Sequence, residues 1–177
     1  FFQQEKPLLF PDISYSFYPV YCKLFGIDYQ TIPLREDYTI NFADYAQANG
    51  GIIFPNPNAP TGRSLALSEI ERLLKTNTSS VVVVDEAYSE YSLNENSALS
   101  LLEGRSRLVV SKTMSKAFAF AGARLGYLIA DPAVIDALQL VRLPYHLSAI
   151  TQAVAEVALS FSDELLAGVD TLIAQRE

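Results

Sequence analysis

Short runs of β-branched and aromatic residues alternate along this chain with stretches whose apolar positions recur at helical spacing. Six of the runs predict strands, at residues 8–15, 28–34, 51–54, 80–84, 107–111 and 125–130. Their separation is typical of βαβ units, in which the chain returns to the same edge of a sheet before each new strand. The pattern therefore predicts an α/β fold, with three α/β/α layers around a mostly parallel sheet.

The stretches between the runs carry signals for helices. Ser68, followed three residues later by Glu71, predicts a capping box, with Ile70, Leu73 and Leu74 on the buried side of the helix. A second helix is predicted at Asp131-Pro132, with Asp as the cap and Pro in the first turn. Its buried stripe is predicted to comprise Val134, Ile135, Leu138 and Val141.

The two ends of the sequence suggest a piece of a longer chain. Phe1 opens the sequence without a Met. The last stretch has helical spacing and no stop signal, with its apolar positions at Leu165, Leu166, Val169, Leu172 and Ile173. We therefore expect truncation at both ends.

Length and composition predict a single domain over residues 1–177. Half of the residues are apolar and 11% are aromatic, which is enough to close one sizeable core. No repeat, low-complexity tract or Gly/Ser-rich linker divides the chain. The four consecutive valines from Val81 to Val84 are apolar toward both faces of a strand, as expected in the centre of a parallel sheet with helices on both sides.

Charge and hydropathy exclude several classes of function. The net charge is −7 and the 13 Lys and Arg residues are scattered, so the chain lacks the basic patch that a nucleic-acid partner needs. No apolar run is long enough to cross a membrane and no secretory signal opens the chain, which predicts a cytoplasmic location. One His and the single Cys22 offer few soft ligands, so no metal is predicted.

Polar residues directly after the apolar runs are the candidates for function, because ligands of open parallel sheets bind beyond the carboxyl ends of the strands. Asp85 follows the run of valines, Lys116 follows the next predicted strand, and Arg124 comes eight residues later. Singly, these residues fit a helix cap or salt bridge, a solvated loop lysine and a structural ion pair. Together they favour a pyridoxal phosphate site, which needs a lysine for a Schiff base, an acid for the pyridine nitrogen and donors for the phosphate.

Three successive motifs resemble those of fold-type I pyridoxal-phosphate-dependent aminotransferases. They are Pro57-Asn58-Ala59-Pro60-Thr61-Gly62, Asp85-Glu86-Ala87-Tyr88, and Ser115-Lys116-Ala117-Phe118 followed by Ala121-Gly122-Ala123-Arg124. Within that superfamily, residues 113–118 and 144–148 are most similar to histidinol-phosphate aminotransferases. The resemblance covers nearly the whole chain and implies the large domain of such an enzyme, without its small domain.

The resemblance implies a role for each matching residue. Lys116 would hold the cofactor as a Schiff base and shuttle a proton between substrate and cofactor. Asp85 would pair with the pyridinium nitrogen, and Tyr88 would donate to the ring oxygen. The phosphate would be bound by hydroxyls and a guanidinium, and an aromatic would stack on the ring. By position, the phosphate ligands are Thr113, Ser115 and Arg124, and the stacking residue is Tyr15.

The chain departs from the family pattern at two positions. Ala59 stands where the family has an Asn that also bonds the ring oxygen, and the neighbouring Asn58 is not assigned that role. His146 stands where an Asn is expected in the stretch 144–148. As the only His it invites a catalytic role, but a structural role is favoured.

The resemblance implies an enzyme of histidine biosynthesis that moves an amino group between histidinol phosphate and 2-oxoglutarate. Its partners would be a small-molecule amino donor, a 2-oxo acid acceptor and a second subunit in a homodimer. Another fold-type I enzyme, either an aromatic or broad-range amino-acid aminotransferase or a phosphoserine-type decarboxylase, would share the same cofactor residues. A non-catalytic pyridoxal-phosphate-binding regulatory module is the alternative from another class, and the joint presence of Lys116, Asp85 and Tyr88 argues against it.

Overall fold

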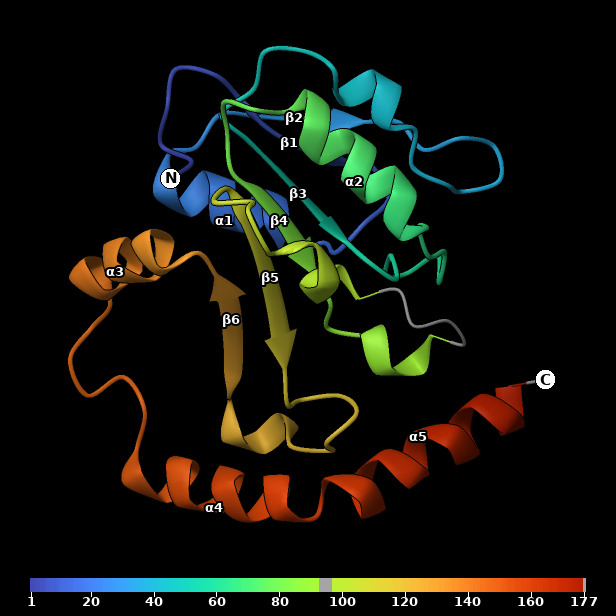
Figure 1. Ribbon diagram of the computed structural model, residues 1–177, viewed down its shortest axis with the longest axis vertical. Coiled ribbons are helices and arrows are strands. Elements are labelled where there is room, and N and C mark those ends of the chain that lie inside the picture. Colours follow the sequence, from blue (N-terminus) through green and yellow to red (C-terminus); the bar gives the residue numbers. More distant parts are fainter. Residues whose placement is uncertain (93–96, 177) are drawn as a thin grey trace.

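The computed structural model describes residues 1–92 and 97–176 (Figure 1). Within them a six-stranded sheet has the order β2-β1-β3-β4-β5-β6. Its strands are β1 Leu8–Pro11, β2 Tyr29–Ile32, β3 Gly51–Pro55, β4 Val82–Asp85, β5 Leu108–Thr113 and β6 Gly126–Ala130. Strands β1 to β5 are parallel, and β6 pairs with β5 in the antiparallel direction at one edge. The predicted α/β fold with a mostly parallel sheet is confirmed.

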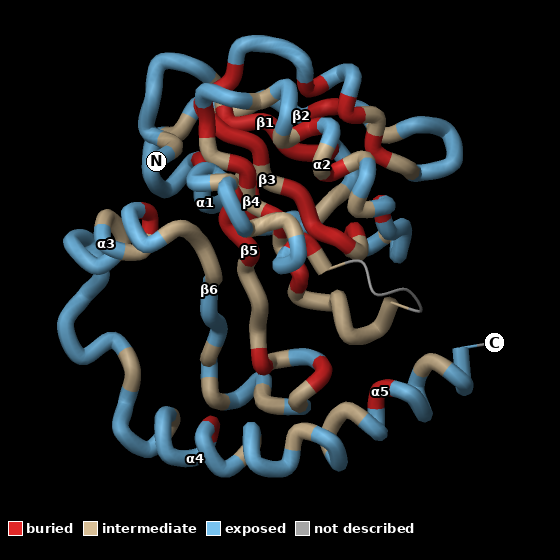
Figure 2. Tube along the Cα trace, in the orientation of Figure 1, coloured by how far each residue is buried: buried red, intermediate tan, exposed pale blue. Residues whose placement is uncertain are grey.

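Helices cover the two faces of the sheet, and the core lies in two clusters. The larger cluster lies between one face and α2 (Leu67–Thr76), and it includes Leu9, Ile52, Phe54, Ile70, Leu73, Val82 and Val84. The smaller cluster lies between the opposite face and α1 (Tyr18–Phe25), and it consists of Leu8, Phe10, Tyr18 and Cys22. Neighbouring residues of a strand point to opposite faces, so β1 contributes to both clusters. In Figure 2 the buried residues lie mostly along β1, β3, β4 and the first half of β5.

All six predicted strands form, with shifted ends. The first was predicted to continue to residue 15 but ends at Pro11. Beyond it the chain turns, because the carboxylate of Asp12 accepts the N–H groups of Ile13 and Leu34. In the run of valines, Val82 and Val84 face the larger cluster and are fully buried, and strand β4 extends beyond them to Asp85.

The predicted capping box at Ser68 is wrong. Helix α2 begins one residue earlier, and its N-cap is Ala66, which has no side-chain oxygen to offer. Glu71 does not reach back to the helix start, because its carboxylate accepts a hydrogen bond from Arg105 at 2.7 Å. The predicted buried side of the helix is confirmed, since Ile70 and Leu73 are buried and Leu74 packs partly buried against the core.

Helix α3 (Pro132–Val141) begins as predicted but buries less than predicted. The carboxylate of Asp131 caps the helix by accepting the N–H of Ala133 at 2.9 Å. In the predicted stripe, Val134 is buried, and Ile135 and Leu138 are partly buried. Val141 was predicted to face inward and is 77% exposed, because the helix ends there and Arg142 turns into extended backbone.

Two further helices extend along the edge of the sheet at which β3, β4 and β5 end (Figure 1). These are α4 (Ala149–Ser160) and α5 (Ser162–Arg176), and α5 contacts the short helix η2 (Ser89–Tyr91). The last predicted helical pattern is confirmed as α5, although only Val169 of its apolar positions is buried. Other short 3₁₀ helices are η1 Phe42–Tyr45, η3 Ala98–Leu101 and η4 Ala121–Ala123. No helix in the described ranges is long and apolar enough to span a membrane.

Candidate functional site

The ends of three parallel strands bring the predicted motifs to one edge of the sheet. Pro55, Asp85 and Ser111 are register partners on β3, β4 and β5. The loops that follow these strands therefore begin side by side, at the edge toward which the strands point in Figure 1. The Pro-Thr-Gly turn follows β3, the turn with Tyr88 follows β4, and the loop with Lys116 follows β5.

Asp85 is the last residue of β4, and two donors orient its carboxylate. Oδ2 accepts a hydrogen bond from the hydroxyl of Tyr18 at 2.9 Å, and Oδ1 accepts one from the N–H of Ala87 at 3.1 Å. Burial and the charge of Asp85 raise the pKa of Tyr18, so its hydroxyl keeps the proton that it donates. A carboxylate has about four lone-pair sites, and Asp85 therefore has capacity for a further donor from a ligand.

Tyr18 also packs against Tyr15, the predicted stacking residue. Their rings meet edge to face, with centroids 5.5 Å apart, and Phe10 packs against Tyr18 at 5.7 Å. Tyr15 itself is 48% exposed, so much of its ring is accessible. One buried tyrosine thus orients both the predicted acid and the predicted stacking ring. Tyr18 was not predicted from the sequence, although Pro19 in the first turn of α1 was a signal that a helix begins there.

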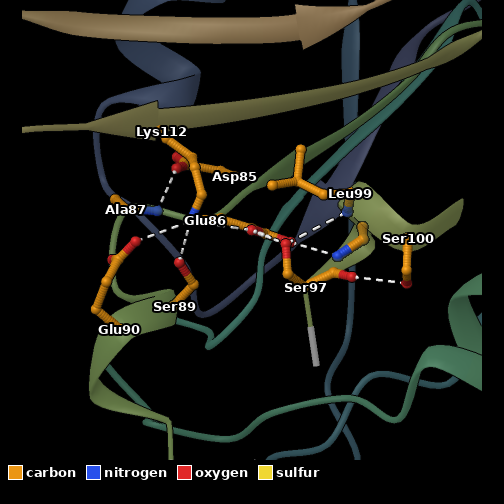
Figure 3. Close-up of polar contacts among 10 residues, drawn as sticks. Asp85, Glu86, Ala87, Ser89, Glu90, Ser97, Leu99, Ser100 and Lys112 are labelled. Carbon is orange, nitrogen blue, oxygen red and sulfur yellow. Dashed lines mark hydrogen bonds and ion pairs between the residues drawn. The ribbon is translucent and has the colours of Figure 1, made fainter. Parts of the chain in front are cut away.

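Buried charges support the turn that follows Asp85 (Figure 3). The side chain of Glu86 is fully buried and accepts hydrogen bonds from the hydroxyl of Ser97 at 2.8 Å and the N–H of Ala98 at 2.6 Å. Nζ of Lys112, on β5, lies 3.3 Å from the same carboxylate. Neither Glu86 nor Lys112 was predicted as a site residue. The available signal was a second acidic residue directly after a buried strand, which must find a partner.

Lys116 extends from the loop after β5 toward Tyr88. Met114 and Ala117 are buried and anchor this loop, whereas Lys116 is exposed. Its Nζ lies 5.1 Å from the centroid of the Tyr88 ring, which is within the range of a cation–π contact. No carboxylate of the described residues forms an ion pair with this amine. The structure therefore brings Lys116 and Tyr88 together and leaves the amine available.

The three predicted phosphate ligands lie in the connection between β5 and β6. The hydroxyl of Thr113 donates to the carbonyl of Leu125 at 3.2 Å and accepts the N–H of Ser115 at 3.1 Å. Arg124, next to Leu125, has a left-handed φ of 54°, which is uncommon outside glycine and often marks functional sites. Its Nη1 donates to the carbonyl of Ala121 at 3.0 Å. The loop thus gathers the three residues, and the guanidinium is bonded within the loop rather than to the two hydroxyls.

Asn58 joins the Pro-Thr-Gly turn to the loop that carries Tyr15. Its side-chain amide donates to the carbonyl of Ile13 at 3.0 Å and to the hydroxyl of Thr61 at 3.1 Å. Its Oδ1 accepts from the hydroxyl of Ser14 at 3.1 Å. Both amide protons are engaged, so Asn58 connects the two loops and offers no donor in place of the Asn that the family has at position 59.

A cavity of about 540 Å³ lies between the Pro-Thr-Gly turn, η2 and the end of α5. Ala59 and Tyr88 line it from the two motif-bearing loops, and Arg176 of α5 lines it from the other side. The space beside Tyr88 is therefore open toward Ala59, whose methyl group cannot donate a hydrogen bond.

His146 lies outside this group of residues. It belongs to the exposed segment between α3 and α4. No hydrogen bond or ion pair of the described residues involves its side chain. The geometry therefore assigns no chemical role to His146.

Comparison with known proteins identifies relatives across the chain. The family model for aminotransferase class I and II matches residues 1–177. Histidinol-phosphate aminotransferase 1 of Pseudomonas fluorescens is 50% identical over 162 residues, which are 91% of this chain and 46% of that protein. Histidinol-phosphate aminotransferase 1 of Hydrogenovibrio crunogenus is 56% identical over 144 residues, 81% of this chain and 40% of that protein. The chain thus spans about half the length of the curated relatives it matches.

Solved structures share the fold. The histidinol-phosphate aminotransferase of Sinorhizobium meliloti, solved in complex with pyridoxal-5′-phosphate, superposes with a TM-score of 0.84 at 23% identity over 93% of this chain and 46% of that one. L-threonine-O-3-phosphate decarboxylase of Porphyromonas gingivalis superposes with a TM-score of 0.75 at 25% identity over 89% of this chain and 46% of that one. The sheet, the three strand-end motifs and the match over residues 1–177 lead to one conclusion: the chain belongs to the class I and II aminotransferases.

Proposed function

We propose that residues 1–177 form the pyridoxal-phosphate-holding large domain of an enzyme that transfers an amino group between histidinol phosphate and 2-oxoglutarate. The observation that carries this proposal is that the segments following β4 and β5 bring Tyr88 and Lys116 together. Asp85 ends β4, Tyr88 lies on the turn after it, and the free amine of Lys116 approaches the Tyr88 ring to 5.1 Å from the loop after β5. The names of the relatives at 50% and 56% identity support the choice of substrate.

The donors of the site fit pyridoxal phosphate in chemical type. Asp85, with lone pairs to spare, would accept the N–H of the protonated pyridine ring. Lys116 would supply the amine that binds the aldehyde carbon. The hydroxyls of Thr113 and Ser115 and the guanidinium of Arg124 would bind the phosphate, because hydroxyl and guanidinium donors suit a dianion.

Two aromatic residues complete the proposed cofactor site. Tyr15, with an accessible ring held by Tyr18, would stack on the pyridine face. The hydroxyl of Tyr88, on the turn after β4, would donate a hydrogen bond to the ring oxygen. Because Ala59 and Asn58 supply no further donor there, Tyr88 is the one side chain of this group that we assign to the ring oxygen.

Bound pyridoxal phosphate supplies an electron-withdrawing ring that stabilises negative charge on the adjacent carbon of the substrate. The residues of the chain would hold that ring and move the proton. Lys116 forms no ion pair among the described residues, so no carboxylate holds its Nζ away from the substrate and the cofactor, between which it would carry the proton. The carboxylate of Asp85 is held in one orientation, because the hydroxyl of Tyr18 and the N–H of Ala87 each donate to one of its oxygens.

The proposed enzyme acts on a small-molecule amino donor and a 2-oxo acid as a cytoplasmic homodimer. Apolar side chains of α4 support further association, since Ile150 is 77% exposed and Val157 is 57% exposed on the same helix. Such exposed apolar surface is typical of a face that another part of an assembly covers.

Covalent trapping on the full-length protein tests the cofactor assignment. Added pyridoxal phosphate should produce a near-visible absorbance band, and borohydride reduction followed by peptide mapping should find a pyridoxyl group on Lys116. Lys116→Ala should lose the band and the turnover, whereas Lys75→Ala, on the exposed side of α2, should retain both. A Lys116→Ala protein that turns over at the wild-type rate would contradict the assignment.

A panel of amino donors with 2-oxoglutarate tests the substrate. We expect the highest kcat/KM for histidinol phosphate. A higher value for an aromatic amino acid, or release of carbon dioxide from a phosphorylated amino acid, would favour another fold-type I enzyme. An absorbance band and a pyridoxyl group on Lys116, without turnover of any amino donor, would favour the non-catalytic regulatory module.

A further inference from the structure

The amine of Lys112 connects strand β5 to the turn that holds Tyr88 (Figure 3). It donates to the hydroxyl of Ser89 at 2.6 Å and to the carboxylate of Glu90 at 2.8 Å. It also lies 3.3 Å from the carboxylate of Glu86. All three partners lie within two residues of Tyr88, so a single side chain from β5 holds the turn on both sides of that tyrosine.

The backbone does not provide this connection. The hydrogen bonds between β4 and β5 reach the N–H of Glu86, which donates to the carbonyl of Ser111 at 2.8 Å. Beyond that point the backbone bonds of the turn are internal, from Ser89 to Glu86 and from Tyr91 to Tyr88. In the part of the chain that the structure describes, the hydrogen bonds from the rest of the turn to β5 are therefore those of Lys112.

The charges of this connection are buried. Only 11% of the Lys112 side chain and none of the Glu86 side chain are exposed. Burial alone would lower the pKa of Lys112, but the hydrogen bond and charge of Glu90 and the charge of Glu86 outweigh it, so the pKa is raised and the amine stays charged. A buried ion pair adds little net stability over apolar side chains of the same size, because removing both charges from water offsets their attraction. The contribution of the ion pair is instead to restrict the positions that the two side chains can take.

We propose that Lys112 and Glu86 are positioning residues, whose buried ion pair holds the Tyr88 turn against β5 and thereby keeps the Tyr88 ring beside the amine of Lys116. The position of Lys116 relative to Lys112 is set by the chain itself, because β5 leads from Lys112 directly into the loop with Lys116. This inference rests on the proposed function of Lys116.

Variants of Lys112 in the full-length protein test the inference. Lys112→Met keeps a long side chain but removes the charge and the donors. We expect kcat to fall by up to roughly 100-fold, since a displacement of about 1 Å near the reacting groups can have that effect. Pyridoxal phosphate should still be trapped on Lys116, and the KM of the amino donor should change much less than kcat. Lys112→Arg should restore most of kcat, and the control Lys75→Met on α2 should match the wild type.

A double variant separates positioning from folding. Lys112→Met alone leaves Glu86 as an unpaired buried charge, which destabilises the fold, whereas Glu86→Gln combined with Lys112→Met removes both charges. We expect the double variant to melt near the wild-type temperature and still to lose kcat. A double variant that binds pyridoxal phosphate and turns over at the wild-type rate would overturn the inference, as would a Lys112→Arg protein as slow as Lys112→Met. If the wild-type protein itself traps no pyridoxal phosphate on Lys116, the proposed function has failed and the inference fails with it.

Discussion

Replacing Tyr18 by Phe removes one hydroxyl and leaves the ring that packs against Phe10 and Tyr15. That hydroxyl donates to Asp85 at 2.9 Å, and only 5% of Tyr18 is exposed, so water cannot easily replace the lost donor. A hydrogen bond to a charged group contributes about 1.5–3 kcal/mol. We expect the lower half of that range, because Asp85 is only partly buried and keeps its bond from the N–H of Ala87.

Urea unfolding of the full-length protein without pyridoxal phosphate measures this loss, with Tyr21→Phe as the matched control. Tyr21 lies on the same helix, is 47% exposed, and its hydroxyl makes no hydrogen bond within the described residues. The control should stay within about 0.5 kcal/mol of the wild type, as exposed substitutions usually do. If Tyr18→Phe also stays within that limit at an unchanged m value, the bond to Asp85 does not hold the carboxylate as argued.

Two further outcomes are expected. Arg124→Ala should weaken the binding of pyridoxal phosphate by about 1.5–3 kcal/mol in an absorbance titration, and a wild-type Kd would remove Arg124 from the phosphate site. Stability should fall at alkaline pH, because the pKa values of Tyr18 and Lys112 are raised above their ordinary values of 10.0 and 10.5, so the folded chain binds more protons there than the unfolded chain. Their contribution is complete below about pH 10 and is lost as the pH rises through the folded values; urea midpoints that stay constant between roughly pH 9 and 11 would contradict this.

The strands were the most predictable part of the fold, because their signal is local. The β-branched runs at residues 51–54 and 80–84 form β3 and β4 with ends shifted by one or two residues. The capping box at Ser68 failed for a reason that lies outside its own stretch. Glu71 is held by Arg105, which lies 34 residues further along the chain, and the helix begins one residue earlier with Ala66 at its N-cap.

The sequence predicted which residues of the candidate site stand at strand ends, but not the hydrogen bonds that connect them to the rest of the chain. Asp85 and Lys116 were identifiable because each follows an apolar run, and parallel strands end at the same edge of a sheet. Their hydrogen-bond partners were not identifiable in this way. The sequence offered ten tyrosines without indicating which one bonds Asp85, and the role of Asn58 in joining two loops depends on a contact with Ser14 across 44 residues.

The sequence alone determined the alternation of strands and helices and the residue type at each strand end. Both are set by interactions between near neighbours, through apolar periodicity and backbone preference. Tertiary structure decided which side chains meet. The bond from Tyr18 to Asp85 spans 67 residues, and Lys112 reaches the Tyr88 turn across 22 to 26 residues. Such pairs exist only once strand register and helix packing have fixed which residues face one another, because a hydrogen bond requires its donor and acceptor within about 3 Å and in line.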